Sequence, residues 1–393
     1  MAKNISVGID VGTYQVKVVV AENTHPGERA VYKKLGTGCA ESKGLRHGYI
    51  INHGDAVKSV RLAVAAAERS SGARIKSAYL SVGGIGLESA VSEATVVVGR
   101  ADYEITDLEL KEVQEACEAA LPQSAVMNRK ILHAIPVKYK IDDKEIYASR
   151  PVGMKGARLG AKTLFITCFE QHLSDLIQAV LDAGVDVIDA IASPVAASFV
   201  TLSKTQKIAG CVLANIGAET VSIIVYENNI PISMEVFPIG STDITNDIAL
   251  GFKIPLEEAE EIKLGTFTST SYPKKKLEEI ISARLSDIFE LIEAHLKKIG
   301  RNGLLPAGII ISGGGSSLMS VEELARNSLK LPSKTAVINF KNEGGSFVDS
   351  TWAVAYGLAV LGFASEEDGE FIGIKIVKGA GANFLSWLKQ FLP

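Results

Sequence analysis

Two short turns that contain glycine constrain this chain more than any other feature of its sequence. One turn occupies residues 9–13 (IDVGT) and the other residues 215–220 (NIGAET), and apolar, β-branched segments precede and follow each turn. The pattern predicts a strand, a tight turn and a second strand at both places. Glycine lets a backbone approach a ligand closely, and consecutive amides in such a turn form a concave anion site. Two such turns, half a chain apart, predict two halves that face one phosphate tail.

A third glycine run lies at residues 308–318 (GIIISGGGSSL), where it follows another apolar strand and leads toward a helical segment at 321–327. Taken alone, each of the three runs could serve only to reverse the chain. In this order and with these strands, two phosphate turns followed by an adenosine turn resemble the ATPase superfamily that includes actin and the sugar kinases. The resemblance implies an α/β protein with two lobes, each ribonuclease H-like, around one nucleotide.

Length, composition and charge narrow the class of protein. A chain of 393 residues, of which 47% are hydrophobic, can form two or three domains with substantial cores. The net charge of −4 and the scattered basic residues offer no positive surface to a polyanion, so we expect no nucleic-acid binding. No apolar run reaches the roughly 20 residues of a membrane-spanning helix. Residues 1–4 lead into the first strand without the features of a signal peptide.

The cysteines and histidines show no spacing typical of a disulfide framework or a metal site. Cys39, Cys117, Cys168 and Cys211 lie far apart and form no CxxC pair, so we expect four buried, reduced thiols in a cytoplasmic protein. The six histidines are also dispersed, and we expect each on the surface or hydrogen-bonded in the core. The sequence contains neither a P-loop motif nor the G-x-S-x-G motif of serine hydrolases.

Hydrophobic periodicity predicts alternating strands and helices in both halves of the chain. A capping-box spacing at Thr106 and Glu109 predicts a helix that begins at Thr106. The character of the chain changes between residues 87 and 161, which predicts a small α+β subdomain inserted in the first half. The strands expected in the first half are 5–9, 16–21, 33–39, 75–82, 94–98, 130–141, 145–149, 163–168 and 187–192. The expected helices are 55–70, 171–183, 243–252, 256–264, 275–299 and 352–361.

Three longer segments carry a more specific resemblance. Residues 44–84, 240–265 and 280–288 are similar to FtsA, the bacterial family of actin-like cell-division proteins. The resemblance extends over essentially the whole chain and includes the inserted subdomain. It implies a first-half core at 1–84 and 162–195 (1A-like), an insert at 85–161 (1C-like), a second-half core at 196–251 and 306–363 (2A-like), a small subdomain at 252–305 (2B-like), a linker at 364–380 and a membrane helix at 381–393.

The family resemblance also implies roles for individual residues. Asp10 would hold Mg²⁺ through water, while the backbones of Gly12 and Thr13 would contact the β- and γ-phosphates of ATP. Glu260 and Lys263 would lie beside the ribose and the adenine, although a solvated surface salt bridge is the alternative for a pair at this helical spacing. The remaining nucleotide contacts implied by the resemblance are Asn215, Gly217 and Thr220 from the second turn, and Gly313, Gly314 and Gly315 beside the adenosine.

The second turn departs from the pattern of the superfamily in a way that bears on catalysis. Asn215 stands where an acidic residue commonly helps to hold the metal and its attacking water, and an amide cannot act as a general base. We therefore expect ATP binding with slow or negligible hydrolysis. Ala218 and Glu219 stand where glycine is frequent, and we expect Glu219 either to face outward or to contact the metal.

The last thirteen residues, 381–393 (GANFLSWLKQFLP), predict an amphipathic helix. The helix is too short to cross a bilayer, so it can dock on its own domain or lie in the membrane interface. An acidic cluster and then Gly379 and Gly381 come before the apolar residues, as in a tether, and FtsA proteins typically end in such a membrane helix, so we expect an interfacial anchor. Its apolar face would consist of Phe384, Leu385, Trp387, Leu388, Phe391 and Leu392.

The resemblance to FtsA implies a cell-division protein that polymerises on the cytoplasmic side of the cell membrane at the division site. There it would tether FtsZ during septum formation and meet other divisome proteins. Arg284, on the long helix of the small subdomain, is the candidate for contact with FtsZ. Two alternatives stay open at this point. One is a PilM-like scaffold of a pilus assembly machine, and the other is an actin-fold small-molecule kinase, although no catalytic aspartate for a substrate hydroxyl is evident.

Overall fold

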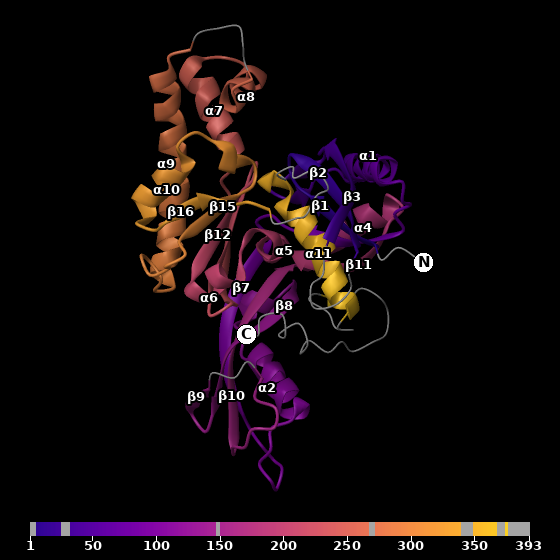
Figure 1. The fold of residues 1–393 in the computed structure, drawn as a ribbon, viewed down its shortest axis with the longest axis vertical. Coiled ribbons are helices and arrows are strands. Elements are labelled where there is room, and N and C mark those ends of the chain that lie inside the picture. The colour runs from indigo at the N-terminus through magenta and orange to yellow at the C-terminus, as the bar shows by residue number, and fades with distance from the viewer. Residues whose placement is uncertain are drawn as a thin grey trace.

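The protein folds into two α/β lobes and a smaller subdomain that extends from the first lobe (Figure 1). The computed structural model describes residues 5–24, 32–146, 150–266, 272–338, 349–367 and 374–375. In Figure 1 the helices of the second lobe lie at one end of the long axis and the inserted subdomain lies at the other. No helix among the described residues has the length and apolar character needed to cross a membrane.

A six-stranded sheet forms the centre of the first lobe, in the order β17-β11-β6-β1-β2-β3. Strands β1, β2 and β3 are antiparallel, whereas β6 and β11 run parallel to β1. Helices α11 and α5 pack together. Helix α11 also lies directly on β1, and glycine at position 8 allows this, because a Cβ there would be 2.3 Å from the Ala355 carbonyl oxygen. The strands are β1 (Ile5–Val11), β2 (Gln15–Asn23), β3 (Tyr32–Glu41), β6 (Ser77–Val82), β11 (Asp186–Ala192) and β17 (Ile374–Lys375), and the helices are α1 (His53–Ser71), α4 (Glu170–Asp182), α5 (Ser193–Thr201) and α11 (Ala353–Glu367).

Strand β3 packs on α1 through glycine, and this arrangement corrects one expectation about the cysteines. Gly36 and Gly38 face α1, where a Cβ on Gly38 would lie 2.0 Å from the Ala63 carbonyl oxygen. Because side chains alternate along a strand, Cys39 points to the opposite side, and it is exposed rather than buried. The other three cysteines are buried, as predicted.

The inserted subdomain is an antiparallel sheet in the order β7-β10-β8-β9, with α2 packed on β7 and β10. The predicted capping box is confirmed, since the Thr106 N–H donates to Glu109 Oε2 at 2.8 Å and the Leu108 N–H donates to Thr106 Oγ1 at 3.3 Å. The elements are β7 (Leu87–Val97), α2 (Asp107–Ala119), α3 (Gln123–Val126), β8 (Arg129–Ile141), β9 (Lys144–Ile146) and β10 (Arg158–Phe169).

The sheet of the second lobe follows the plan of the first. Its order is β14-β13-β12-β15-β16, with three antiparallel strands followed by two strands parallel to β12. Helix α9 packs between α7 and α10 and buries Leu285, Ile288 and Phe289. The elements are β12 (Cys211–Ile216), β13 (Val221–Glu227), β14 (Ile230–Phe237), β15 (Ile309–Ser312), β16 (Ser333–Thr335), α6 (Lys204–Ala209), α7 (Ser241–Phe252), α8 (Leu256–Leu264), α9 (Lys274–Lys298) and α10 (Val321–Leu329).

Two expected strands belong to longer strands in the structure, and the helices α3, α5 and α6 were not expected. The strand expected at 94–98 is the end of β7, which begins at Leu87, because the exposed positions of this long strand weaken its apolar signal. The strand expected at 163–168 is the second half of β10, which starts at Arg158 and pairs with β7 and β8 along its length. All residues of α5 except Phe199 are buried, so this helix lacks the amphipathic period that marks a surface helix.

Candidate functional site

A cleft of 680 Å³ lies between the two lobes, and both glycine turns line it. This volume is within the range of sites that hold small-molecule ligands. Gly315 is not among the lining residues. It packs instead against Ile216, whose Cγ2 would lie 2.3 Å from a Cβ at this position. The predicted site residues that do line the cleft are Asp10, Gly12, Thr13, Asn215, Gly217, Thr220, Glu260, Lys263, Gly313 and Gly314.

The two turns have the same geometry. In each hairpin four residues, 12–15 and 217–220, connect the last paired residues of the two strands. A Cβ on Gly12 would lie 2.9 Å from the carbonyl oxygen of the fourth turn residue, and a Cβ on Gly217 would lie 2.9 Å from the equivalent oxygen. Each turn therefore requires glycine at its first position, and the two turns bring equivalent backbone segments to one cleft.

Asp10 is the residue before the last of β1 and lines the wall of the cleft. The Ser81 hydroxyl donates to Asp10 Oδ1 at 2.7 Å and accepts a hydrogen bond from the Val11 N–H at 3.3 Å. Burial raises the pKa of Asp10, while the Ser81 hydrogen bond and the charge of Lys17 act in the opposite direction. A cation in the cleft would favour the charged form of this carboxylate.

Lys17 lies on β2 in the same wall and was not anticipated from the sequence. Its Nζ donates to the Thr351 carbonyl oxygen at 2.8 Å and lies 5.5 Å from the centre of the Trp352 ring. Burial lowers the pKa of Lys17, whereas the charges of Asp10 and Asp349 raise it. The signal in the sequence was a single charge within an apolar strand.

The second turn is held from two directions. A Cβ on Gly313 would lie 2.3 Å from Asn215 Oδ1, and Gly313 has a φ of 83°, so glycine is required beside the Asn215 side chain. Glu219 neither faces outward nor joins the residues that line the cleft. Its Oε2 accepts a hydrogen bond from the backbone N–H of His47, in the first lobe, at 2.5 Å.

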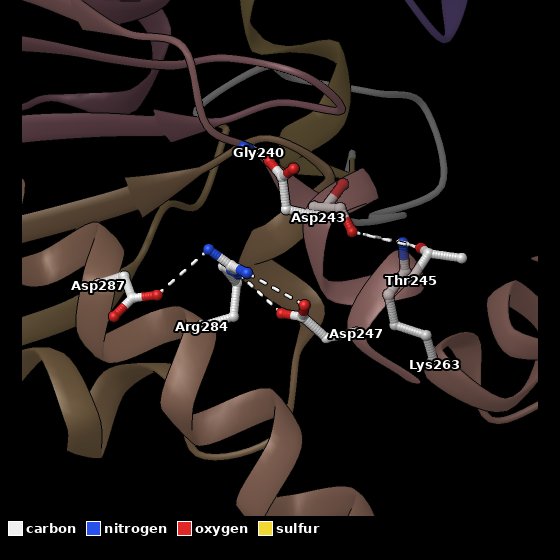
Figure 2. A network of polar contacts seen from close by, with 8 residues as sticks. Gly240, Asp243, Thr245, Asp247, Lys263, Arg284 and Asp287 are labelled. Carbon is white, nitrogen blue, oxygen red and sulfur yellow. Dashed lines mark hydrogen bonds and ion pairs between the residues drawn. The ribbon is translucent and has the colours of Figure 1, made fainter. Parts of the chain in front are cut away.

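Glu260 and Lys263 form an ion pair at the other end of the cleft, where Figure 2 shows Lys263 beside Thr245. Lys263 Nζ lies 2.6 Å from Glu260 Oε2 and donates to Thr245 Oγ1 at 2.8 Å and to the Ser241 carbonyl oxygen at 3.1 Å. The Thr245 hydroxyl donates to Glu260 Oε2 at 2.5 Å. Because the Lys263 side chain is only 5% exposed, this is not the solvated surface pair considered as the alternative.

Arg284 lies on α9, where its guanidinium contacts two carboxylates (Figure 2). Its Nε and Nη2 donate to the two oxygens of Asp247, on α7, at 2.7 and 3.0 Å. Its Nη1 donates to Asp287 Oδ2, one turn along α9, at 3.2 Å. Helix α7 thus contributes Thr245 to the wall of the cleft, and Asp247 of the same helix pairs with Arg284 of α9.

The predicted membrane-binding residues lie outside the part of the chain that the structure describes. The same holds for the expected linker, apart from residues 364–367 and 374–375. The residues concerned are Phe384, Leu385, Trp387, Leu388, Phe391 and Leu392.

Almost the whole chain is similar in sequence to known proteins. Residues 84–167 match the family model of the SHS2 domain inserted in FtsA, and residues 212–357 match that of cell division protein FtsA. The chain is 30% identical over 383 residues to cell division protein FtsA of Borreliella burgdorferi, which covers 92% of this chain and 91% of that protein. It is 29% identical over 386 residues to cell division protein FtsA of Pseudomonas aeruginosa, with 92% and 90% covered.

Solved structures show the same fold at low sequence identity. The PilM–PilN type IV pilus biogenesis complex has a TM-score of 0.67 at 17% identity, covering 91% of this chain and 98% of that one. MreB5 of Spiroplasma citri bound to ADP has a TM-score of 0.51 at 11% identity, covering 93% and 98%. These likenesses confirm the predicted actin-like fold. At such identities they concern the fold alone, so they do not favour a pilus scaffold.

Proposed function

Because this chain belongs to the FtsA family of actin-like cell-division proteins, we propose that it binds ATP with Mg²⁺ and serves as a membrane adaptor for FtsZ. The observation that carries the proposal is the cleft between the lobes, to which two equivalent glycine turns bring their backbones. Such a pair of turns can hold the charged oxygens of a phosphate chain from both sides.

The chemistry of the cleft fits a magnesium nucleotide. Mg²⁺ keeps several waters and is usually bound by one or two carboxylates together with substrate phosphates, which suits Asp10, the carboxylate beside the first glycine turn. Among the described residues no three His, Cys, Asp or Glu side chains form a metal-ligating group, so water and phosphate would supply the other ligands. Lys17 would add a positive charge on the same wall, and Gly12, Thr13, Gly217 and Thr220 would contact the phosphates.

The other end of the cleft suits a nucleoside. Glu260 offers a carboxylate that is 31% exposed and can accept hydrogen bonds from ribose hydroxyls. A Cβ on Gly314 would meet no atom within 4 Å, so the space beside this backbone is open to a flat base. Two structures of MreB5 with this fold were solved with ADP or AMPPNP, which supports a nucleotide as the ligand.

We expect hydrolysis of ATP to be slow or absent because of Asn215. Its amide lines the cleft where the superfamily commonly has an acidic residue, and it cannot accept a proton from an attacking water. A single-turnover assay with purified protein and Mg²⁺ tests this step. Rapid release of phosphate from a stoichiometric complex would contradict it.

Membrane attachment is proposed to depend on residues 381–393. Six large apolar side chains would contribute on the order of 10 kcal/mol when buried in the interface. Ordering a dozen residues costs a similar amount, at about 1 kcal/mol or more for each residue. One helix is therefore a marginal anchor, whereas several anchors on one filament can raise the affinity by about 10² or more. Self-assembly of ATP-bound subunits would thus make attachment stable.

FtsZ and other divisome proteins are the proposed partners at the division site, on the cytoplasmic side of the membrane. Arg284 is the proposed contact, although its donors to Asp247 and Asp287 also bind α9 to α7. A substitution of Arg284 would thus change the exposed surface of α9 and would also remove the contacts that hold α9 to α7. A variant of an exposed residue elsewhere on α9, such as Glu290, would test the surface of the helix without breaking this network.

Co-sedimentation with liposomes tests the proposal as a whole. Full-length protein should pellet with vesicles that contain anionic lipid, and more of it should pellet with ATP and Mg²⁺ present. Deletion of the last thirteen residues should abolish pelleting while ATP binding stays unchanged. Equal pelleting of the truncated protein would contradict the anchor, and failure to bind ATP would contradict the assignment of the cleft.

A further inference from the structure

A pair of polar contacts crosses between the lobes at the second glycine turn. Glu219 Oε2 accepts a hydrogen bond from the His47 backbone N–H at 2.5 Å. His47 Nδ1 lies 3.2 Å from the Glu219 carbonyl oxygen and donates to it in the tautomer protonated at that nitrogen. Both residues are partly buried, so these contacts are sheltered from bulk water.

The His47 end of this contact is held in place within the first lobe. His47 lies in the tight turn between β4 (Leu45–Arg46) and β5 (Tyr49–Ile50) and has a φ of 48°. Its carbonyl oxygen accepts a hydrogen bond from the Ile85 N–H at 3.2 Å. The next residue, Gly48, packs so closely on Gly84 that an added Cβ would lie 2.5 Å from the Gly84 Cα.

The Glu219 end is equally constrained by the second lobe. The first two residues of α7 donate backbone hydrogen bonds to the turn, from Ser241 to Gly217 at 2.9 Å and from Thr242 to Ala218 at 2.8 Å. A Cβ on Gly240 would lie 2.2 Å from the Ala218 carbonyl oxygen, so the turn packs directly on the residue that precedes α7.

The chain neighbours of both contact residues line the cleft, one from each lobe. Gly48, Gly83 and Gly84 line the cleft from the first lobe, and Gly217 and Ala218 line it from the second. Any motion that moves these two walls apart must stretch the bonds between His47 and Glu219, because neither end can follow the other.

We infer that Glu219 is a positioning residue, a latch between the lobes that controls how long a nucleoside triphosphate stays in the cleft. The inference rests on the proposed function for the identity of the ligand, but the latch itself is a property of the protein alone. A glycine at this position would provide no carboxylate, so the latch is a feature of this chain's own NIGAET turn.

Release of a fluorescent ATP analogue from the full-length protein tests the inference by stopped flow. Hydrogen bonds to charged groups contribute about 1.5–3 kcal/mol, so Glu219→Ala should release the analogue at least about tenfold faster. Glu219→Gln keeps an acceptor oxygen at the same reach and should restore part of the residence time. Glu219→Asp keeps the charge but is one methylene shorter, and it should behave like the alanine variant. Glu278→Ala, at an exposed position of α9, is the matched control and should release the analogue at the wild-type rate.

A second measurement decides on the latch without any nucleotide. Cys39 is exposed in the first lobe while the other three cysteines are buried, so it can pair with a label at Lys275→Cys on α9 for pulsed electron spin resonance. Glu219→Ala should lengthen or broaden the distance distribution between the lobes. An unchanged distribution, or release at the wild-type rate from Glu219→Ala, would overturn the latch. Absence of analogue binding by the wild type would instead overturn the proposed function. The distance measurement would then decide by itself whether Glu219 holds the lobes together.

Discussion

Replacing Lys263 with methionine should destabilise the ligand-free protein. Methionine retains an apolar stem of similar length but removes the ammonium group, which contacts Glu260 at 2.6 Å, Thr245 at 2.8 Å and the Ser241 carbonyl oxygen at 3.1 Å. Glu260 would then keep only the Thr245 hydrogen bond among these contacts, and α8 would lose the two hydrogen bonds that Lys263 donates to the first turns of α7.

The magnitude follows from the exposure of the two partners. Removing one partner of a fully buried ion pair costs about 3–5 kcal/mol, and a hydrogen bond to a charged group contributes about 1.5–3 kcal/mol. Lys263 is 5% exposed but Glu260 is 31% exposed, so water can partly solvate the remaining carboxylate. We therefore expect a loss of about 2 kcal/mol in the free energy of unfolding. With an m-value of about 2 kcal/mol/M, the urea midpoint should fall by about 1 M.

Urea titration followed by far-ultraviolet circular dichroism provides the assay. Lys297→Met is the matched control, since Lys297 pairs with Glu293 at 2.9 Å on the exposed side of α9 and is 58% exposed. That variant should have the wild-type midpoint. The double variant Lys263→Met with Glu260→Gln should lose less than the sum of the two single losses. Equal midpoints for Lys263→Met and Lys297→Met would refute the reasoning.

Three further substitutions test other parts of the account. Burial raises the pKa of Asp10, so its contribution to stability is present at acidic pH and is lost as the pH rises through the raised value. Asp10→Asn should therefore raise the thermal midpoint of the ligand-free protein at neutral pH but not in acid, while it weakens ATP binding in Mg²⁺. A lower midpoint at neutral pH would contradict this. Gly313→Ala should destabilise the protein more than Gly303→Ala in thermal melts, since both have positive φ but only the Cβ at Gly313 would meet other atoms within 4 Å. Similar losses would show that backbone strain alone, about 1–3 kcal/mol, decides the effect. Trp387→Glu should weaken vesicle binding by about tenfold or more in co-sedimentation, because a buried aromatic side chain contributes about 1.5–3 kcal/mol. Gln390→Glu adds the same charge to the polar face, and an equal loss there would argue against insertion.

Local features of the sequence are sufficient to predict much of the fold. The glycine turns depend on residues that are adjacent in the chain, and the capping box depends on two residues three positions apart, so both can be recognised before the structure is known. The actin-like fold followed from the order of the turns and from a resemblance that extends over the whole chain. Helix α5 could not be predicted, because burial on nearly all sides removes the alternation of apolar and polar residues that marks a surface helix.

The details of the site depend on contacts between distant segments. Glu219 and His47 are 172 residues apart, and nothing near either residue indicates that they meet. The sequence did not show that Lys17 contacts the Thr351 carbonyl oxygen, 334 residues away, because that contact depends on how α11 packs against β1 and β2. The spacing of Glu260 and Lys263 places them on one helix face, but only the packing of α8 on α7 buries Lys263 and makes that face a wall of the cleft.

Photoaffinity labelling with an azido-adenosine triphosphate tests the central claim most directly, because it reports which peptides lie beside the bound base. The account predicts labelling that Mg²⁺-ATP competes away and that maps to peptides from α8 (Leu256–Leu264) or from residues 313–318, at the cleft between the lobes. Labelling confined to the inserted subdomain or to the outer face of α9, or labelling that excess ATP does not reduce, would contradict it.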